Sequence, residues 1–318
     1  MWSVGGDGLN RFDRVNNKWE HFVHNEKDSK SLGANGICAI LRDNKGNLWL
    51  GGWGAGLNLF NEKTKTFKRF LNNPKDSTSI SSNNVFGITQ DQDGILWIAT
   101  MGGGLNRFDP EKNVFKSFHT NVNDITCIST NWIKSVLEMQ NNEIWIASGN
   151  GLDVFNKKTE KFSHYKNAEN NLKSISNNQI VVLFKDSKKN TWVGTEYGLN
   201  RFNPENNSFS RFTEEDGLCN NVIRGICEDN KGNLWMSTNK GLSEFKNAVN
   251  KQDTVVFKNY FVDDGLQSDE FNSRTCNKGI DGSLYFGGSN GYNVFDPEKI
   301  LTKPHKPEVV LTNLWIIK

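Results

Sequence analysis

The feature that most constrains the fold of this 318-residue chain is a unit that occurs seven times along it. Each unit has an aromatic residue after a short apolar run, and these aromatics are Trp2, Trp49, Trp97, Trp145, Trp192, Trp235 and Tyr285. Successive aromatics are 47, 48, 48, 47, 43 and 50 residues apart. A second signature follows each aromatic, as in GLNRF (104–108) and GLDVF (151–155). Seven coincident pairs at one period indicate a repeat architecture.

The third unit shows what one repeat contains. Residues 84–91 and 95–100 are rich in strand-forming side chains, and residues 105–109 and 114–119 alternate apolar with polar residues. No window has the 3.6-residue period and caps of a helix, so we expect very little helix. Four short antiparallel strands per unit at this period predict an all-β fold, a seven-bladed β-propeller with four antiparallel strands per blade, over residues 1–300.

Composition agrees with many short, half-buried strands. Hydrophobic residues make up 36% of the chain, and its mean hydropathy is −0.62. The formal net charge is only +2, which gives no electrostatic footprint for nucleic acid or an anionic membrane surface. No stretch approaches the roughly 20 apolar residues that span a bilayer.

The two ends of the repeat region differ from the rest. The first unit begins at its second strand, because no inner strand precedes WSVGG (2–6). The tail, residues 301–318, contains the β-rich segment PEVVLTNLWIIK (307–318). We expect the tail to be either a strand that closes the ring or the start of a further module, and the second interpretation is favoured.

Three segments carry a family resemblance. DNKGNLWLGGWGAGLNLFN (43–61), DNKGNLWMSTNKGLSEF (229–245) and DGSLYFGGSNGYNVFDPEKI (281–300) resemble the two-component regulator propeller repeat. The tail is similar to the opening of the immunoglobulin-like module that follows such propellers. The resemblance implies a periplasmic or cell-surface sensor of a membrane-anchored hybrid histidine kinase. It further implies an immunoglobulin-like module and a kinase region in the same polypeptide, an oligosaccharide ligand, and a receptor that could act as a homodimer.

In a propeller, the loops from the second to the third strand share one face with the loops from the fourth strand to the next blade, and ligands usually bind there. The position 14 residues before the aromatic is asparagine in five units, and an amide suits sugar hydroxyls. Its repetition favours a structural role in a turn. The residues are Asn35, Asn83, Asn131, Asn178 and Asn221.

The position 11 residues before the aromatic varies between units. It is occupied by Cys38, Phe86, Lys134, Val181, Arg224 and Arg274. If these side chains turn toward the axis, three cations converge there, which costs free energy unless an anion or solvent compensates. Lys134, Arg224 and Arg274 therefore predict a site for the carboxylate or sulfate of an acidic sugar. The alternative is a channel wall that is merely hydrated.

The loops after the aromatic supply further candidates. They are one residue longer in units two and three, where they carry Trp53 and Met101. Trp53, and Tyr197 in the matching TEYG loop, could stack on a sugar ring, or they could pack on a neighbouring loop. The remaining candidates on this face are Trp132, Glu196, Lys240 and Glu270.

Neither a metal nor a cofactor is expected. The DNKGN and DQDG turns lack the ligand series of a calcium loop, so they are interpreted as tight turns. The five cysteines, Cys38, Cys127, Cys219, Cys227 and Cys276, form no CxxC motif and are interpreted as small buried apolar residues. A single disulfide between Cys219 and Cys227 is the alternative.

Catalysis is not expected, although TQDQDGILW (89–97) faintly resembles a sialidase Asp-box and the repeat resembles propeller lyases. The histidines fall in or beside outer strands or in the tail, away from the axis. Glu196 with Glu270 remains an alternative acid–base pair for a glycosidase. A propeller that binds only proteins is the third alternative, and it would expose a large apolar patch.

Overall fold

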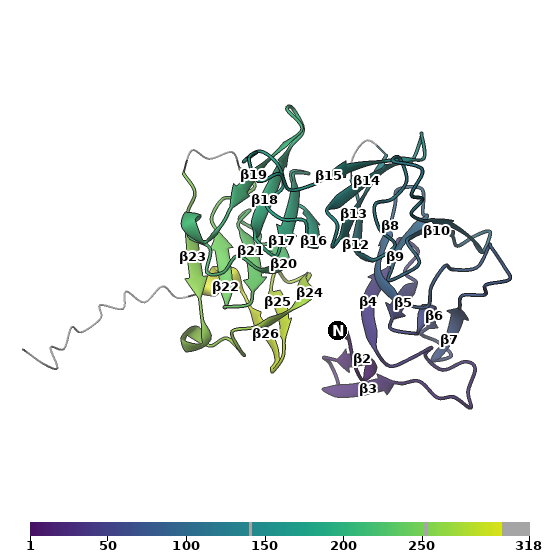
Figure 1. Cartoon of the computed structure of the whole chain (residues 1–318). Coiled ribbons are helices and arrows are strands. Elements are labelled where there is room, and N and C mark those ends of the chain that lie inside the picture. Colours follow the sequence, from purple (N-terminus) through teal and green to yellow (C-terminus); the bar gives the residue numbers. More distant parts are fainter. Residues whose placement is uncertain (140–141, 251–253, 301–318) are drawn as a thin grey trace, which may run out of the picture.

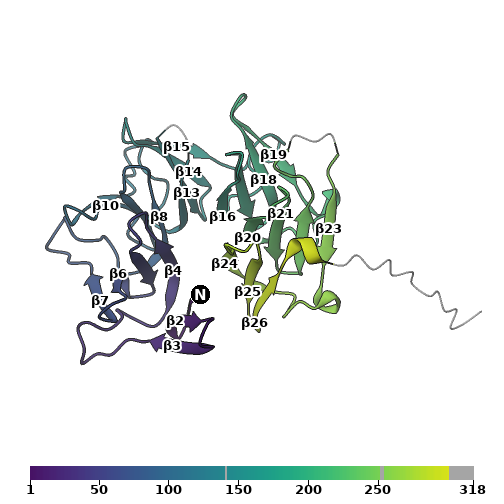
Figure 2. The ribbon, with the colours of Figure 1, turned by 180° about the vertical axis from the view of Figure 1, so that it is seen from behind.

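The structure is a computed structural model that describes residues 1–139, 142–250 and 254–300. Seven antiparallel sheets follow one another in chain order around a central axis, as Figures 1 and 2 show from opposite sides. The predicted seven-bladed β-propeller is therefore confirmed. The tail, residues 301–318, lies outside the described residues, so the prediction made for it stays a prediction.

The strands of the first four blades include those of blade three, which lie close to the ranges expected for the third unit. Blade one contains β1 (Trp2–Gly5), β2 (Gly8–Asp13) and β3 (Lys18–Phe22). Blade two contains β4 (Ile37–Arg42), β5 (Leu48–Gly52), β6 (Gly56–Asn61) and β7 (Thr66–Phe70). Blade three contains β8 (Val85–Gln90), β9 (Leu96–Thr100), β10 (Leu105–Asp109) and β11 (Val114–Phe118). Blade four contains β12 (Ile133–Glu138), β13 (Glu143–Ser148), β14 (Leu152–Asn156) and β15 (Lys161–Tyr165).

The last three blades complete the ring. Blade five contains β16 (Ile180–Lys185), β17 (Thr191–Thr195), β18 (Gly198–Asn203) and β19 (Ser208–Phe212). Blade six contains β20 (Ile223–Glu228), β21 (Leu234–Thr238), β22 (Leu242–Phe245) and β23 (Phe257–Tyr260). Blade seven contains β24 (Phe271–Lys278), β25 (Leu284–Gly288) and β26 (Gly291–Phe295). The helices of the described residues are three single-turn 3-10 helices, at Glu214–Asp216, Val262–Asp264 and Pro297–Lys299.

The two end blades have three described strands each, where the sequence predicts four per blade. In blade one the inner strand is absent from the described residues, as expected from WSVGG (2–6). In blade seven the described residues supply no outer strand after β26. The other five blades have the predicted four strands.

The repeated tryptophan is anchored by the repeated aspartate of the turn that precedes it. In blade two, the Trp49 indole N–H donates to the Asp43 carboxylate at 2.8 Å, and both residues are buried. The same carboxylate accepts the backbone N–H groups of Lys45 and Asn47. The equivalent pairs are Trp97 with Asp91, Trp192 with Asp186, and Trp235 with Asp229. These carboxylates therefore stabilise tight turns, as the sequence indicated.

The core lies between the blades. Six apolar clusters fill the six interfaces from blades one and two to blades six and seven. Each blade thus buries its apolar faces against its neighbours, since one thin sheet cannot bury them alone. In the described ranges, no such cluster joins blade seven to blade one. There the Arg14 guanidinium lies 5.8 Å from the centre of the Tyr285 ring and 3.7 Å from the Asp281 carboxylate.

Candidate functional site

A bulge recurs in the inner strands at the variable position 11 residues before the aromatic. The ladders of β4, β8, β12, β16 and β20 each skip one residue there. The skipped residues are Cys38, Phe86, Lys134, Val181 and Arg224. A bulge leaves its extra residue unpaired and re-aims the side chain. This local geometry explains how these side chains can leave the blade and meet at the axis.

Blade seven carries a larger irregularity at the same place. In β24 the pairing jumps from Phe271 to Cys276, and Arg274 within this bulge has φ +62°. This conformation is uncommon for a residue with a side chain. The Arg274 guanidinium donates to the backbone carbonyl of Phe86 at 2.8 Å and to that of Lys134, and it lies 5.7 Å from the centre of the Phe86 ring. Arg274 therefore reaches across the axis from blade seven to blades three and four.

Lys134, Arg224 and Arg274 form a group that we call the axial cluster. Burial is the largest effect on the pKa of Lys134 and lowers it, and the charges of Arg274 and Arg224 lower it further. Glu196 opposes this shift. In the part of the chain that the structure describes, no carboxylate lies within ion-pair distance of the three cations. The predicted convergence of three cations is thus present, and its positive charge is not neutralised by close pairing.

Neutral groups orient two members of the axial cluster. The Lys134 ammonium donates to the Gln179 side-chain oxygen at 3.0 Å. Arg224 donates from Nε to the Asn239 side-chain oxygen at 2.7 Å and from Nη1 to the Ser273 hydroxyl at 3.2 Å. Arg224 Nη2 has no hydrogen-bond partner among the described residues. Neutral acceptors fix these side chains without cancelling their charge, which leaves donor capacity for an anion.

The sequence did not indicate Asn239 or Ser273 as part of this site. Asn239 comes from the loop after β21, and Ser273 lies within the β24 bulge. The position of Asn239 varies between units, as many surface residues do, whereas Ser273 stands where units two to six have isoleucine or valine. In the sequence, Asn239 lies next to the candidate Lys240, in the loop that precedes the signature GLSEF (241–245).

Two exposed tryptophans, Trp53 and Trp132, lie on the face of the propeller that contains the loops between the second and third strands. Trp53 is half-exposed, and its ring meets the Phe86 ring edge-on with the centroids 4.5 Å apart. The Arg274 guanidinium lies near the same Phe86 ring, so Phe86 links Trp53 to the axial cluster. Trp132 is 59% exposed and forms an isolated backbone bridge with Met101. Trp53 therefore packs on a neighbour along one edge and remains accessible elsewhere.

The other candidates lie in loops of the same face. Glu196 is exposed and acts on Lys134 through its charge. Tyr197 is half-exposed beside it, and its backbone N–H donates to the Thr195 hydroxyl. Lys240 and Glu270 are exposed, and within the described ranges neither forms a hydrogen bond or ion pair with a member of the axial cluster. The structure gives no contact between Glu196 and Glu270, the pair considered for catalysis, within the ranges that it describes.

The repeated asparagines act in the scaffold, as the sequence favoured. The side-chain oxygen of Asn83 accepts the backbone N–H of Asn72, and its backbone carbonyl accepts the N–H of Gly56. Equivalent pairs of bonds are made by Asn35, Asn131, Asn178 and Asn221. These bonds join the loop of one blade to the loop that enters the next blade. They confirm that both sets of loops share one face.

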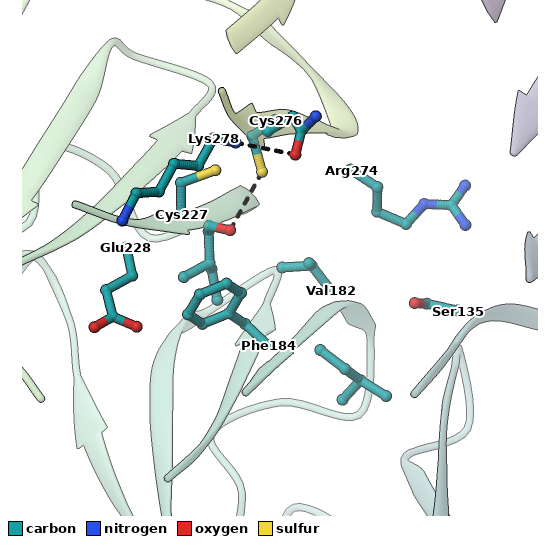
Figure 3. A pocket seen from close by; sticks show the side chains of 11 residues that line it. Ser135, Val182, Phe184, Cys227, Glu228, Arg274, Cys276 and Lys278 are labelled. Carbon is teal, nitrogen blue, oxygen red and sulfur yellow. Dashed lines mark hydrogen bonds between the residues drawn. The ribbon is translucent and has the colours of Figure 1, made fainter. Parts of the chain in front are cut away.

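A cavity of about 430 Å³ extends from Arg274 between the inner strands of blades four to seven (Figure 3). Its wall includes Phe184, Cys227, Glu228 and Lys278. These residues follow the bulges along the inner strands, toward the face opposite the axial cluster. Within the described ranges, no group of three or more His, Cys, Asp or Glu side chains is arranged to hold a metal ion.

Comparison with known proteins identifies the repeat. Residues 31–54, 79–102, 174–197 and 217–240 match the family described as the two component regulator propeller. These four segments of the chain are thus similar to that repeat. No curated protein matches its sequence. The helices in the described part of the chain are all too short to cross a membrane.

Several solved structures share the fold. One is the extracellular domain of a protein described as a hybrid two component system of B. thetaiotaomicron, with 21% identity and a TM-score of 0.74. A second is the extracellular domain of a protein described as a one component system of the same organism, with 21% identity and a TM-score of 0.56. A third is PorZ, a surface component of the type-IX secretion system of Porphyromonas gingivalis, with 17% identity and a TM-score of 0.67.

The alignments cover 92%, 93% and 93% of this chain, but only 38%, 41% and 43% of those three structures. This chain therefore corresponds to less than half the length of each of them.

Proposed function

We propose that this propeller, built from two component regulator repeats, is the extracytoplasmic sensor domain of a signalling protein. The repeat type and the extracellular neighbours of the same fold support this proposal. Because those neighbours are more than twice as long as this chain, further domains of the same polypeptide would carry the signal, including an immunoglobulin-like module and a kinase region. A homodimer of the whole receptor would be compatible with this role.

The ligand that we propose is an acidic oligosaccharide bound at the face above the axial cluster. The observation that carries this proposal is the group of three cations with no ion-paired carboxylate in the described structure. An anionic group in this position would accept from Lys134 and from Arg224 Nη2. Charge-assisted hydrogen bonds of this kind are about twice as strong as neutral ones. Trp53 offers the adjacent apolar face on which a sugar ring can stack.

Calorimetric titration tests the proposal with two probes of equal length, a hexasaccharide of uronic acids and a neutral hexasaccharide. We expect the acidic probe to bind and the neutral probe to bind much more weakly. Arg224→Met should weaken binding of the acidic probe by roughly tenfold or more, because it removes a hydrogen-bond donor that carries charge. Affinity should also fall as the pH rises through the lowered pKa of Lys134, since the neutral amine no longer attracts the anion.

Lys112→Met is the matched control. Lys112 is 80% exposed in the turn between β10 and β11, on the opposite face, so its loss should leave the affinity unchanged. Equal affinity for both probes, or an Arg224→Met variant that binds like the parent chain, would contradict the proposed ligand. Product analysis of the same mixtures separates the alternatives. Cleaved probe indicates a glycosidase or lyase, and absence of any binding favours a protein-interaction propeller.

A further inference from the structure

Two cysteines pack in the same apolar cluster where blade six meets blade seven. Cys227 lies on β20 and Cys276 on β24, and both line the axial cavity (Figure 3). All five cysteines of the chain are free thiols in the structure. Cys227 is buried, whereas Cys276 is half-buried. The Cys276 thiol is therefore more accessible than the Cys227 thiol.

The two inner strands approach each other closely at this point. A Cβ atom placed on Gly225 would lie 3.3 Å from Cys276 Cβ and 2.8 Å from Cys276 Sγ. This close approach places the Cys276 side chain against β20, two residues before Cys227. The absence of a side chain at Gly225 gives the Cys276 side chain its room.

The Cys276 side chain also points along β20 toward Cys227. Cys276 Sγ donates to the backbone carbonyl of Ile226 at 3.3 Å, and that carbonyl belongs to the peptide bond that leads into Cys227. The neighbouring Cys276 thiol, followed by burial, raises the pKa of Cys227 well above its usual range. The approach to Gly225 and the bond to Ile226 therefore place the Cys276 thiol beside the part of β20 that contains Cys227.

The other thiols have different surroundings. Cys219 Sγ lies 3.3 Å from the Thr238 hydroxyl, so the disulfide between Cys219 and Cys227 considered from the sequence is not formed. Cys127 Sγ forms hydrogen bonds with the backbone of Asn121 in an exposed loop. Cys38 lies at its own bulge near Arg274, and burial raises the pKa of its thiol. None of these three contacts Cys227 or Cys276 in the described structure.

We propose that Cys227 and Cys276 form a redox-active pair that a small disulfide compound in the cavity converts into a disulfide between blades six and seven. The Cys276 thiolate attacks the compound and forms a mixed disulfide, which releases one thiol. The Cys227 thiolate then attacks the Cys276 sulfur and releases the second thiol. Two protein thiols are oxidised, one compound disulfide is reduced to two thiols, and the protons of the protein thiols pass to the released thiolates.

The bond would change how the ring is held together. It would close a loop from residue 227 to residue 276 and so restrict the unfolded chain. It would also fix β24 at a point two residues from Arg274, whose side chain reaches across the axis. The oxidised chain should therefore hold blade seven more firmly than the reduced chain. This inference does not depend on the proposed ligand.

The test uses the whole chain, equilibrated with 2-hydroxyethyl disulfide at pH 8 and then compared with the chain in dithiothreitol. We expect the free thiols under denaturing conditions to fall from five to three after oxidation. Digestion without reductant should give one linked pair of peptides, containing Cys227 and Cys276. The Tm should rise by a few degrees. Five alkylated thiols after prolonged oxidation, or a linked pair with any other cysteine, would overturn the proposal.

Two variants distinguish a specific disulfide between Cys227 and Cys276 from general oxidation of the cysteines. Cys276→Ala should abolish both the linked peptides and the rise in Tm, whereas Cys38→Ala should leave both unchanged. Circular dichroism of the reduced variants establishes that each is folded. If Cys276→Ala fails to fold, peptide mapping of the parent chain still decides the question. An oxidised chain with a linked pair but an unchanged Tm would contradict the proposed effect on the ring.

Discussion

Lys157 shows how a single side chain joins two blades on the face away from the axial cluster. Its ammonium lies 3.1 Å from the carboxylates of Asp91 and Glu138, and 3.4 Å from that of Asp93. Burial alone would lower the pKa of Lys157, but the bonds to Asp91 and Glu138 outweigh burial and raise it. The two blades thus share one largely buried cation, because Asp91 belongs to blade three and Glu138 to blade four.

Lys157→Met is expected to lower the free energy of unfolding by about 2–4 kcal/mol, since it leaves two buried carboxylates without their partner. Urea unfolding at pH 7 measures this loss. Because the pKa is raised on folding, the contribution is fully present below the unfolded pKa of about 10.5 and disappears as the pH rises through the folded value. The difference between parent and variant should therefore shrink in strongly alkaline buffer.

Lys112→Met is the control, because it removes an exposed ion pair instead of a buried one. Lys112 pairs with Asp109 at 3.3 Å, but its side chain is 80% exposed. A solvated pair of this kind contributes about 0–1 kcal/mol. Equal losses for the two variants would show that the buried position of Lys157 does not matter.

At the scale of strands, the sequence predicted the repeat better than the details of pairing. The four strands of blade three were expected at 84–91, 95–100, 105–109 and 114–119, and they lie within one residue of those limits. This succeeds because apolar alternation and turn residues are local properties of the chain. A bulge is a relation between two strands, so no single strand reveals it.

The candidate site was predictable to the same extent. Alignment of the repeats predicted Lys134, Arg224 and Arg274, because each is a cation at a position that varies within an otherwise repeated unit. It could not supply Asn239 and Ser273, since these contacts depend on how neighbouring loops and the β24 bulge fold in three dimensions. Nor could it show that Arg274 bonds to backbone carbonyls on the far side of the axis.

The β24 bulge can be tested as an element by comparing two substitutions at Arg274. Both Arg274→Ala and Arg274→Gly remove the bonds to the carbonyls of Phe86 and Lys134 and should destabilise the chain. Glycine adopts the positive φ of this position without strain, whereas alanine does not. Arg274→Gly should therefore be more stable than Arg274→Ala by about 1 kcal/mol in urea unfolding.

Val181 is the internal control for this comparison. It occupies the equivalent bulge of β16 but is not among the residues with positive φ. There the order should reverse, with Val181→Ala more stable than Val181→Gly by about 0.5–1 kcal/mol. The same order at both positions would mean that the backbone strain assigned to Arg274 is absent.

At the scale of the whole molecule, the interfaces between blades are unequal. Six of them contain an apolar cluster, whereas the contact between blades one and seven is made by Arg14 with Tyr285 and Asp281. Arg14 and Asp281 are each about half exposed, at 53% and 48%. Ion pairs of this kind contribute little in water. The described ring is therefore weakest between its first and last blades.

Hydrogen exchange measures this difference directly when strands with equal pairing are compared. β2, β25 and β13 each have hydrogen-bonded neighbours on both sides, so pairing alone predicts similar protection. We expect amides of β2 and β25 to exchange at least about tenfold faster than those of β13, because the described residues form no apolar cluster that opening of blades one and seven would break. Arg14→Ala should accelerate exchange in β2 and β25 and leave β13 unchanged. Uniform protection across the three strands, or an Arg14→Ala effect spread over all seven blades, would show instead that the ring opens as one cooperative unit.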